Sequence, residues 1–378
     1  MDKTKNRFIA VAREVLLLAA MLLGLPLLGV YLAGLPVGRY LEFPPRTFFV
    51  QHAPFSWAVF GGYSIAISVV LVVLLQVWKK GRKKPLPNCH PPARPFPWWG
   101  WLALSGNLIF WFLAWTRFHW FSAWQLHTFT PLWLSFIVVI NALSYRLKGQ
   151  CMMTHQTHFF LALFPVSSVF WWFFEYLNRF VQNWHYLGPE YGAWQYFWLA
   201  TLPFATVLPA VLSVREWLLG HAPFAAAFKD CVSLQPAHPK ALAVLLLVGS
   251  AVGLAGIGVY PNLLFSLLWL SPGLIILSIQ TLRGERQVFS DICRGDWSVA
   301  VSSALAALLC GWFWEMWNYY SLAKWQYSIP YVNRFHIFEM PVLGYAGYLP
   351  FGLECAVVAD LLSTVIPRDQ KHLQPGRY

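Results

Sequence analysis

Long apolar runs alternate with short polar segments along the chain, and this pattern predicts membrane-spanning helices. The runs are continuously apolar rather than alternating with a period of two, which favours helices over the strands of a membrane barrel. A crossing needs about 20 apolar residues, so a chain of this length accommodates about ten helices joined by short loops. The predicted helices are centred on Leu17–Leu35, Trp57–Trp78, Trp98–Trp115, Phe129–Tyr145, Phe159–Leu177, Phe197–Val214, Ala241–Tyr260, Leu263–Leu282, Val299–Trp317 and Val342–Ile366.

Composition strengthens this prediction of an all-α integral membrane protein. The 378 residues are 58% hydrophobic and 11% charged, whereas about a quarter of the residues of a soluble protein carry charge. The same composition excludes a disordered chain. The first apolar run follows the basic residues Lys3, Lys5, Arg7 and Arg13, as in a signal peptide. It is too long for a signal peptide and lacks a clear cleavage site, so we expect a retained helix.

The net charge of +12 is distributed in a way that indicates orientation. If the N-terminus is cytoplasmic, 21 of the 27 Lys and Arg fall on the inner side and six on the outer side, as the positive-inside rule requires. The basic run from Lys79 to Lys84 then faces anionic lipid, and a nucleic-acid partner is not expected. We therefore predict a multi-pass protein of a bacterial-type inner or plasma membrane, with both termini cytoplasmic.

Cysteine and histidine give little support for disulfides, metals or cofactors. Cys89, Cys151, Cys231 and Cys293 fall in predicted inner loops, and the other two cysteines fall within helices, so no disulfide is expected. His155 and His158 have an i, i+3 spacing that suits two metal ligands, but no carboxylate follows them closely, and no C-x-x-C pair exists. Nucleotide-binding glycine motifs and the common hydrolase motifs are absent. We expect neither a metal nor a cofactor.

An internal repeat is the most informative signal in the sequence. The recurring residues include two types that are rare within membranes, Glu and Asn. Trp172, Phe173, Glu175 and Asn178 recur 140 residues later as Trp312, Phe313, Glu315 and Asn318. Trp184 and Tyr186 recur as Trp325 and Tyr327, and Leu202-Pro203-Phe204 recurs as Leu349-Pro350-Phe351.

The repeat predicts the organisation of the chain. It divides the chain into two N-terminal helices with a basic loop (1–95), a first four-helix unit (96–237) and a second (238–378). An even number of helices in each unit means that both enter the membrane in the same direction, so the repeat is parallel.

Glu175 and Glu315 are the first candidate catalytic residues. Each lies near the outer end of its helix and shares a helix face with an Asn three residues later, Asn178 or Asn318. A carboxyl group among Trp171, Trp172, Trp312 and Trp314 is poorly solvated, which favours the neutral form that a proton donor needs. The alternative is an interfacial glutamate that reaches the headgroups or pairs with Arg179 or Arg334.

Glu354 is the third candidate catalytic residue. It falls about midway along the last predicted helix, where an ionised carboxylate costs at least about 2.5 kcal/mol, so it is either neutral or paired. Glu339, at the outer entrance of the same helix, is a candidate for substrate binding. The other candidates for substrate binding are Asn178, Asn318, Trp172, Trp312, Trp325 and Tyr327.

The second half resembles a known family. Trp314-Glu315, then Trp325 and Tyr327, then the segment from Leu349 to Glu354 are similar in order to the small membrane lycopene cyclase domain of some bacteria and fungi. That family carries two tandem domains with an acid, a Trp-x-Tyr element and a Leu-Pro-x-Glu-Glu-like motif. The resemblance implies that Glu354 takes the place of the essential acid, with Glu315 and Glu175 as its partners. The tandem acids of the family are reduced here to Glu354 alone.

These features favour an enzyme that acts on a long apolar isoprenoid or lipid by acid catalysis within the membrane, as a cyclase or isomerase does. Alkene protonation needs a neutral acid, aromatic faces to stabilise a cation, and the exclusion of water. A proton-coupled carrier and a non-catalytic lipid-binding or assembly protein use the same residue types and remain alternatives. In each case we expect membrane lipids and a hydrophobic small molecule as partners.

Overall fold

The computed structural model describes residues 2–81 and 94–367, with side chains from Leu16 onward. Arg82, Lys83, Lys84 and Cys89 lie outside the described residues. The first part of the chain forms α1 (Asp2–Leu32), η1 (Val37–Tyr40), α2 (Trp57–Gly81), α3 (Trp98–Trp115), η2 (His119–His127), α4 (Phe129–Lys148), α5 (Met152–His155), α6 (Thr157–Val181), β1 (Trp184–Leu187), α7 (Ala193–Phe204), α8 (Val207–Gly220) and α9 (Ala222–Ala227). The second part forms α10 (Pro239–Gly256), α11 (Pro261–Leu264), η3 (Phe265–Trp269), α12 (Ser271–Arg283), η4 (Ser290–Arg294), α13 (Ser298–Tyr319), β2 (Lys324–Tyr327), β3 (His336–Ile337), β4 (Met340–Pro341), η5 (Val342–Gly347) and α14 (Tyr348–Val365).

The prediction of a helical membrane protein is confirmed, whereas the predicted number of ten membrane-spanning helices is not confirmed. Within the described ranges, seven helices are long and apolar enough to cross a membrane. A pair bent by 54° at Leu270, formed by Pro261–Trp269 and Ser271–Arg283, raises the number to eight if it counts as one span. The seven are Trp57–Gly81, Phe129–Lys148, Thr157–Val181, Ala193–Gly220, Pro239–Gly256, Ser298–Tyr319 and Val342–Val365.

Two predicted helices are not among these seven. The side chains of α1 are described from Leu16 onward, and Leu16–Leu32 is the apolar part of this helix that the structure describes. Helix α3 has 18 residues, five of which are tryptophans. The Asn107 amide donates hydrogen bonds to the Leu132 carbonyl (3.0 Å) and the Ser135 hydroxyl (3.2 Å) of α4. Helix α3 therefore satisfies its polar group by packing against α4.

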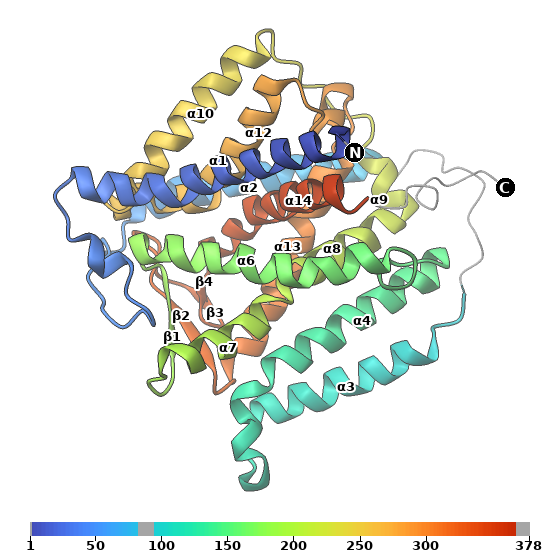
Figure 1. The fold of residues 1–378 in the computed structure, drawn as a ribbon. Helices are drawn as coiled ribbons and strands as arrows, with labels where there is room; N and C mark the ends of the chain where they lie inside the picture. Colours follow the sequence, from blue (N-terminus) through green and yellow to red (C-terminus); the bar gives the residue numbers. More distant parts are fainter. Residues whose placement is uncertain (1, 82–93, 368–378) are drawn as a thin grey trace.

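Four helices form the centre of the molecule, as Figure 1 shows: α6, α8, α13 and α14. Helix α8 contacts α4, α6 and α13, and α13 also packs along α14. The hairpin of α3 and α4 lies on one side of this centre, and α10 with α12 lies on the other. This arrangement leaves the ends of α6 and α13 close together.

A short antiparallel ladder joins those two ends. Strand β1 follows α6, strand β2 follows α13, and Trp184 pairs with Tyr327 while Tyr186 pairs with Trp325. The two segments that the repeat relates are therefore hydrogen-bonded to each other. Because the ladder joins them, the loops after α6 and α13 lie at the same end of the helices.

The segment between α1 and α2 lies over that end. The Gln182 carboxamide oxygen accepts hydrogen bonds from the backbone N–H groups of Phe49 and Val50, both at 2.9 Å. The His52 ring lies between the Ser328 hydroxyl (2.7 Å) and the Val181 carbonyl (2.8 Å). His52 thus ties this segment to both α6 and the residue after β2.

Two glycines allow α13 and α14 to approach closely. A Cβ atom at Gly352 would lie 2.1 Å from the Ser303 carbonyl oxygen, so only glycine permits this backbone contact. A Cβ atom at Gly311 would lie 2.4 Å from the ring of Tyr348. Gly311 therefore makes room for the Tyr348 ring one helical turn before Glu315.

Candidate active site

An aromatic-walled cavity of about 380 Å³ lies beside the β1–β2 ladder. Its volume is within the range of about 300–1,000 Å³ that is typical of small-molecule sites. Lys324 is the only charged residue among the described residues that line it, and none of them is a carboxylate. The aromatic lining residues that the argument below uses are Trp171, Trp184, Tyr186, Trp269, Trp314, Trp325, Tyr327, Tyr348 and Phe351.

Glu175 lies directly behind this wall on α6. The residue is buried, with 7% of its surface exposed. One carboxyl oxygen, Oε1, accepts three hydrogen bonds: from the indoles of Trp171 (3.2 Å) and Trp184 (2.9 Å) and from the hydroxyl of Tyr186 (2.7 Å). All three donors line the cavity. They connect the buried carboxyl group to the space that a ligand would fill.

Glu315 has the corresponding place on α13 and is fully buried. Its Oε1 accepts hydrogen bonds from the hydroxyls of Tyr327 (2.7 Å) and Tyr348 (2.6 Å), which both line the cavity. The indole of Trp325 donates in turn to the Tyr327 hydroxyl at 2.8 Å. The other oxygen, Oε2, is buried without a hydrogen-bond partner.

The ladder tyrosines are suited to donate these hydrogen bonds. Burial raises the pKa of Tyr327 well above that of an ordinary phenol, and the neighbouring Glu315 raises it further. Burial raises the pKa of Tyr186 in the same way, although its ring, 37% exposed, lines the cavity. Both hydroxyls therefore keep their protons at neutral pH.

Asn178 and Asn318 hold the strands rather than face the cavity. The Asn178 amide donates to the Trp184 carbonyl (2.8 Å), and its oxygen accepts from the Asn183 N–H (2.8 Å). The Asn318 amide donates to the Trp325 carbonyl (2.8 Å), and its oxygen accepts from the Trp325 N–H (2.9 Å). Each Asn thus fixes a strand at the end of its helix, which in turn positions the donors to the acid.

Glu354 lies apart from the cavity lining. It is buried on α14, and its Oε1 accepts a hydrogen bond of 2.9 Å from the Gly273 N–H, near the N-terminus of α12. A Cβ atom at Gly273 would lie 3.0 Å from Cγ of Glu354, so the carboxyl group occupies the space beside this glycine. Its Oε2 has no hydrogen-bond partner. The structure thus brings Glu175 and Glu315 to one cavity but places Glu354 at a different contact.

The remaining predicted residues lie in three different places. Trp325 and Tyr327 line the cavity. Trp172 stacks on Phe197 and donates to the Thr201 hydroxyl (2.9 Å), and Trp312 is 43% exposed; neither lines the cavity. Glu339 forms an ion pair with Lys324 at the cavity lining.

Sequence reasoning missed several lining residues. Trp184 and Tyr186 were visible as the repeats of Trp325 and Tyr327. No sequence pattern indicated Trp269 and Tyr348, because these lining residues lie far along the chain from the acids behind the wall.

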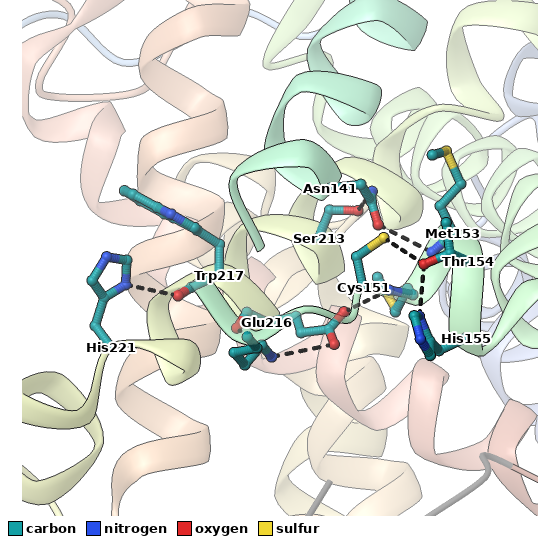
Figure 2. A network of polar contacts seen from close by, with 11 residues as sticks. Asn141, Cys151, Met153, Thr154, His155, Ser213, Glu216, Trp217 and His221 are labelled. Carbon is teal, nitrogen blue, oxygen red and sulfur yellow. Dashed lines mark hydrogen bonds and ion pairs between the residues drawn. The ribbon is translucent and has the colours of Figure 1, made fainter. Parts of the chain in front are cut away.

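His155 lies in a polar network away from the cavity, shown in Figure 2. Glu216 of α8 accepts a hydrogen bond from the Met152 N–H (3.1 Å), and the Thr154 hydroxyl contacts Nδ1 of His155 (2.7 Å). The bond to Glu216 fastens the short helix α5 to α8. Among the described residues, no group of three or more His, Cys, Asp or Glu is arranged to hold a metal ion.

No family model, curated protein or solved structure matches this chain. The argument for function therefore rests on the contacts described above.

Proposed function

We propose that this protein is an intramembrane enzyme that converts a long apolar isoprenoid or lipid by proton transfer, as a cyclase or isomerase of the lycopene cyclase type does. The observation that carries the proposal is that cavity-lining tyrosine hydroxyls bind buried glutamates directly behind the wall. An apolar ligand fits the cavity, and the glutamates provide the chemistry.

The chemistry requires each of these parts. Protonation of an alkene needs a carboxylic acid that is neutral, and a fully buried position such as that of Glu315 disfavours the charged form. The resulting carbocation is stabilised by aromatic faces, which Trp314, Trp325 and Phe351 supply. Exclusion of water prevents the cation from being captured as an alcohol.

The proposal includes the origin and orientation of the fold. We take 96–237 and 238–378 as two parallel four-helix units derived by duplication, preceded by two N-terminal helices. Two observations support this: Asn178 and Asn318 each donate to the carbonyl of the equivalent strand tryptophan, Trp184 or Trp325, and the strands pair with each other. We place both termini in the cytoplasm of a bacterial-type cell, which puts the ladder at the outer side.

Lipid analysis tests the proposal. Lipid extracts are compared between cells that lack the protein and cells that express the wild type, Glu315→Gln or Glu354→Gln. General acid catalysis contributes about 10²–10⁴-fold in rate, so Glu315→Gln should accumulate the unreacted lipid that the wild type consumes. The Glu354→Gln variant distinguishes the roles of the acids. Because Glu354 lies off the cavity, the folded variant should still convert the lipid.

Unchanged lipid profiles in all samples would contradict an enzyme. A loss of pH-dependent uptake in the variants would then favour a proton-coupled carrier, and intact uptake would favour a lipid-binding or assembly protein.

A further inference from the structure

The two acids behind the cavity wall are equivalent in position but differ in their hydrogen bonds. Glu175 has three donors on one oxygen, two indoles and a hydroxyl. Several donors directed at one carboxyl group stabilise its ionised form. Arg179 lies one helical turn further along α6, with its guanidinium 3.3 Å from Glu42. A cation on the same helix face also favours a charged Glu175.

Glu315 has a different environment. It has two donors on Oε1, and its Oε2 is buried with no partner. An ionised oxygen in that position would carry charge without any compensating hydrogen bond, whereas a neutral carboxylic acid places its proton there at lower cost. The nearby acid Glu339 already pairs with Lys324.

We infer that the two glutamates divide the reaction between them: Glu315 is the acid, acting through the Tyr348 hydroxyl, and Glu175 is the base, acting through the Tyr186 hydroxyl. This inference rests on the proposed function. It adds two catalytic tyrosines that would touch the ligand and gives each acid one role. Two carboxyl groups in contrasting environments commonly serve as an acid and base pair.

Tyr348 is better suited than Tyr327 to carry the proton from Glu315. The Tyr327 hydroxyl donates to Glu315 and also accepts from the Trp325 indole. The Tyr348 hydroxyl donates to Glu315 and also interacts with the Tyr327 hydroxyl, but among the described residues no indole is found to donate to it, so its oxygen can accept a proton. Tyr348 also lines the cavity, where its ring fits over Gly311.

The first half lacks a counterpart of Tyr348. The repeat places Thr201 at the corresponding position, 147 residues earlier. Its hydroxyl accepts from the Trp172 indole and donates to the Phe197 carbonyl (2.6 Å), so it is not directed at Glu175. The relay through Tyr348 therefore belongs to the second half alone.

The proton transfers balance. The alkene π pair takes the Tyr348 hydroxyl proton and forms a C–H bond, and the Glu315 acid proton moves to the Tyr348 oxygen after the carboxyl group rotates about its broad terminal torsion. The carbocation then loses a proton from an adjacent carbon to the Tyr186 oxygen. The electron pair of the broken C–H bond forms the new double bond. The original Tyr186 proton passes to Glu175. Exchange with water between turnovers returns one proton to Glu315 and removes one from Glu175.

Infrared spectroscopy of the purified full-length protein at neutral pH tests the assignment without a ligand. A protonated carboxyl group has a C=O stretching band that a carboxylate lacks. We expect Glu315→Gln to lose one such band, Glu354→Gln to lose at most a separate band, and Glu175→Gln to leave the carboxylic acid region unchanged. Tyr348→Phe should shift the Glu315 band to higher frequency because the C=O group loses a donor, and Tyr186→Phe should not shift it.

Retention of the carboxylic acid bands in Glu315→Gln, or loss of one in Glu175→Gln, would overturn the division of roles. The lipid extracts of the same variants separate this result from the proposed function. Tyr348→Phe with normal lipid conversion and an unshifted band would exclude the relay. Lipid profiles that stay unchanged in all variants, together with the expected infrared bands, would contradict the proposed enzymatic function but support the assigned protonation states.

Discussion

Tyr186 lies opposite Trp325 in the ladder of β1 and β2, so the hydroxyl that serves Glu175 is paired with a residue that serves the site of Glu315. Strand β1 carries two of the three donors to Glu175, and β2 carries one of the two donors to Glu315. The ladder therefore couples the geometry of both sites at one edge of the cavity, and a change in one strand is expected to affect the other.

Disrupting the attachment of one strand should lower stability. Asn318→Leu removes two hydrogen bonds to the Trp325 backbone, which leaves buried groups unpaired at a cost of about 1–3 kcal/mol. We expect a lower midpoint of thermal unfolding for Asn318→Leu, with Asn333→Ala, at an exposed position, as the control. Equal midpoints for both variants would contradict the role of Asn318 in holding β2.

Enlarging Gly311 should disturb the site without changing an acid. In Gly311→Ala the new Cβ atom would lie 2.4 Å from the Tyr348 ring, so the ring must move away and its hydroxyl loses Glu315. We expect lipid conversion to fall by at least about tenfold, given that general acid contributions are larger than this. Gly249→Ala is the matched control, because a Cβ atom there meets nothing within 4 Å. Full conversion by Gly311→Ala would show that the Tyr348 position does not matter.

The sequence predicted the acid sites better than it predicted their surroundings. The spacing of Glu and Asn in the repeat located Glu175 and Glu315 at equivalent helix ends, and the strands that follow bring both to one cavity. Trp172 packs against the lining residues Tyr196 and Phe204 without lining the cavity itself, whereas Trp171, four positions before Glu175, lines it and donates to Glu175.

Contacts between distant segments could not be predicted. Tyr348 lies 33 residues from Glu315, and its position depends on how α14 packs over Gly311. Glu354 lies midway along its predicted helix, but the neighbour that it faces, Gly273, is decided by the packing of α12 against α14.

The stability of the segment between α1 and α2 should depend on pH through His52. Burial lowers the pKa of this histidine below its ordinary value, and the Val181 carbonyl accepts a hydrogen bond from Nε2. Because the folded state favours the neutral ring, its contribution is present above about pH 6.5 and is lost as the pH falls through the lowered pKa. The unfolding midpoint should drop between about pH 7 and pH 5, and the drop should be smaller in His52→Gln. An identical drop in both proteins would exclude His52 as the cause.

Cysteine labelling should establish the orientation. Glu190→Cys and Asn333→Cys introduce thiols at exposed positions of the loops after α6 and α13, which we place outside the cell. A membrane-impermeant maleimide should label both in intact cells. The native Cys293 is exposed and predicted to be inside, so it should react only after the membrane is opened. Labelling of Cys293 alone in intact cells would show that the orientation in the membrane is the reverse of the proposed one.

Deuterium incorporation tests the central claim most directly, because a proton from an exchangeable acid must become a carbon-bound hydrogen of the product. Membranes that contain the wild-type protein are incubated in D2O with the lipid extract of Glu315→Gln cells, and membranes with Glu315→Gln serve as the control. The account predicts a product lipid that carries one deuterium on carbon with the wild type and no product with the variant. A product without deuterium, or equal conversion by both membranes, would contradict proton transfer from Glu315.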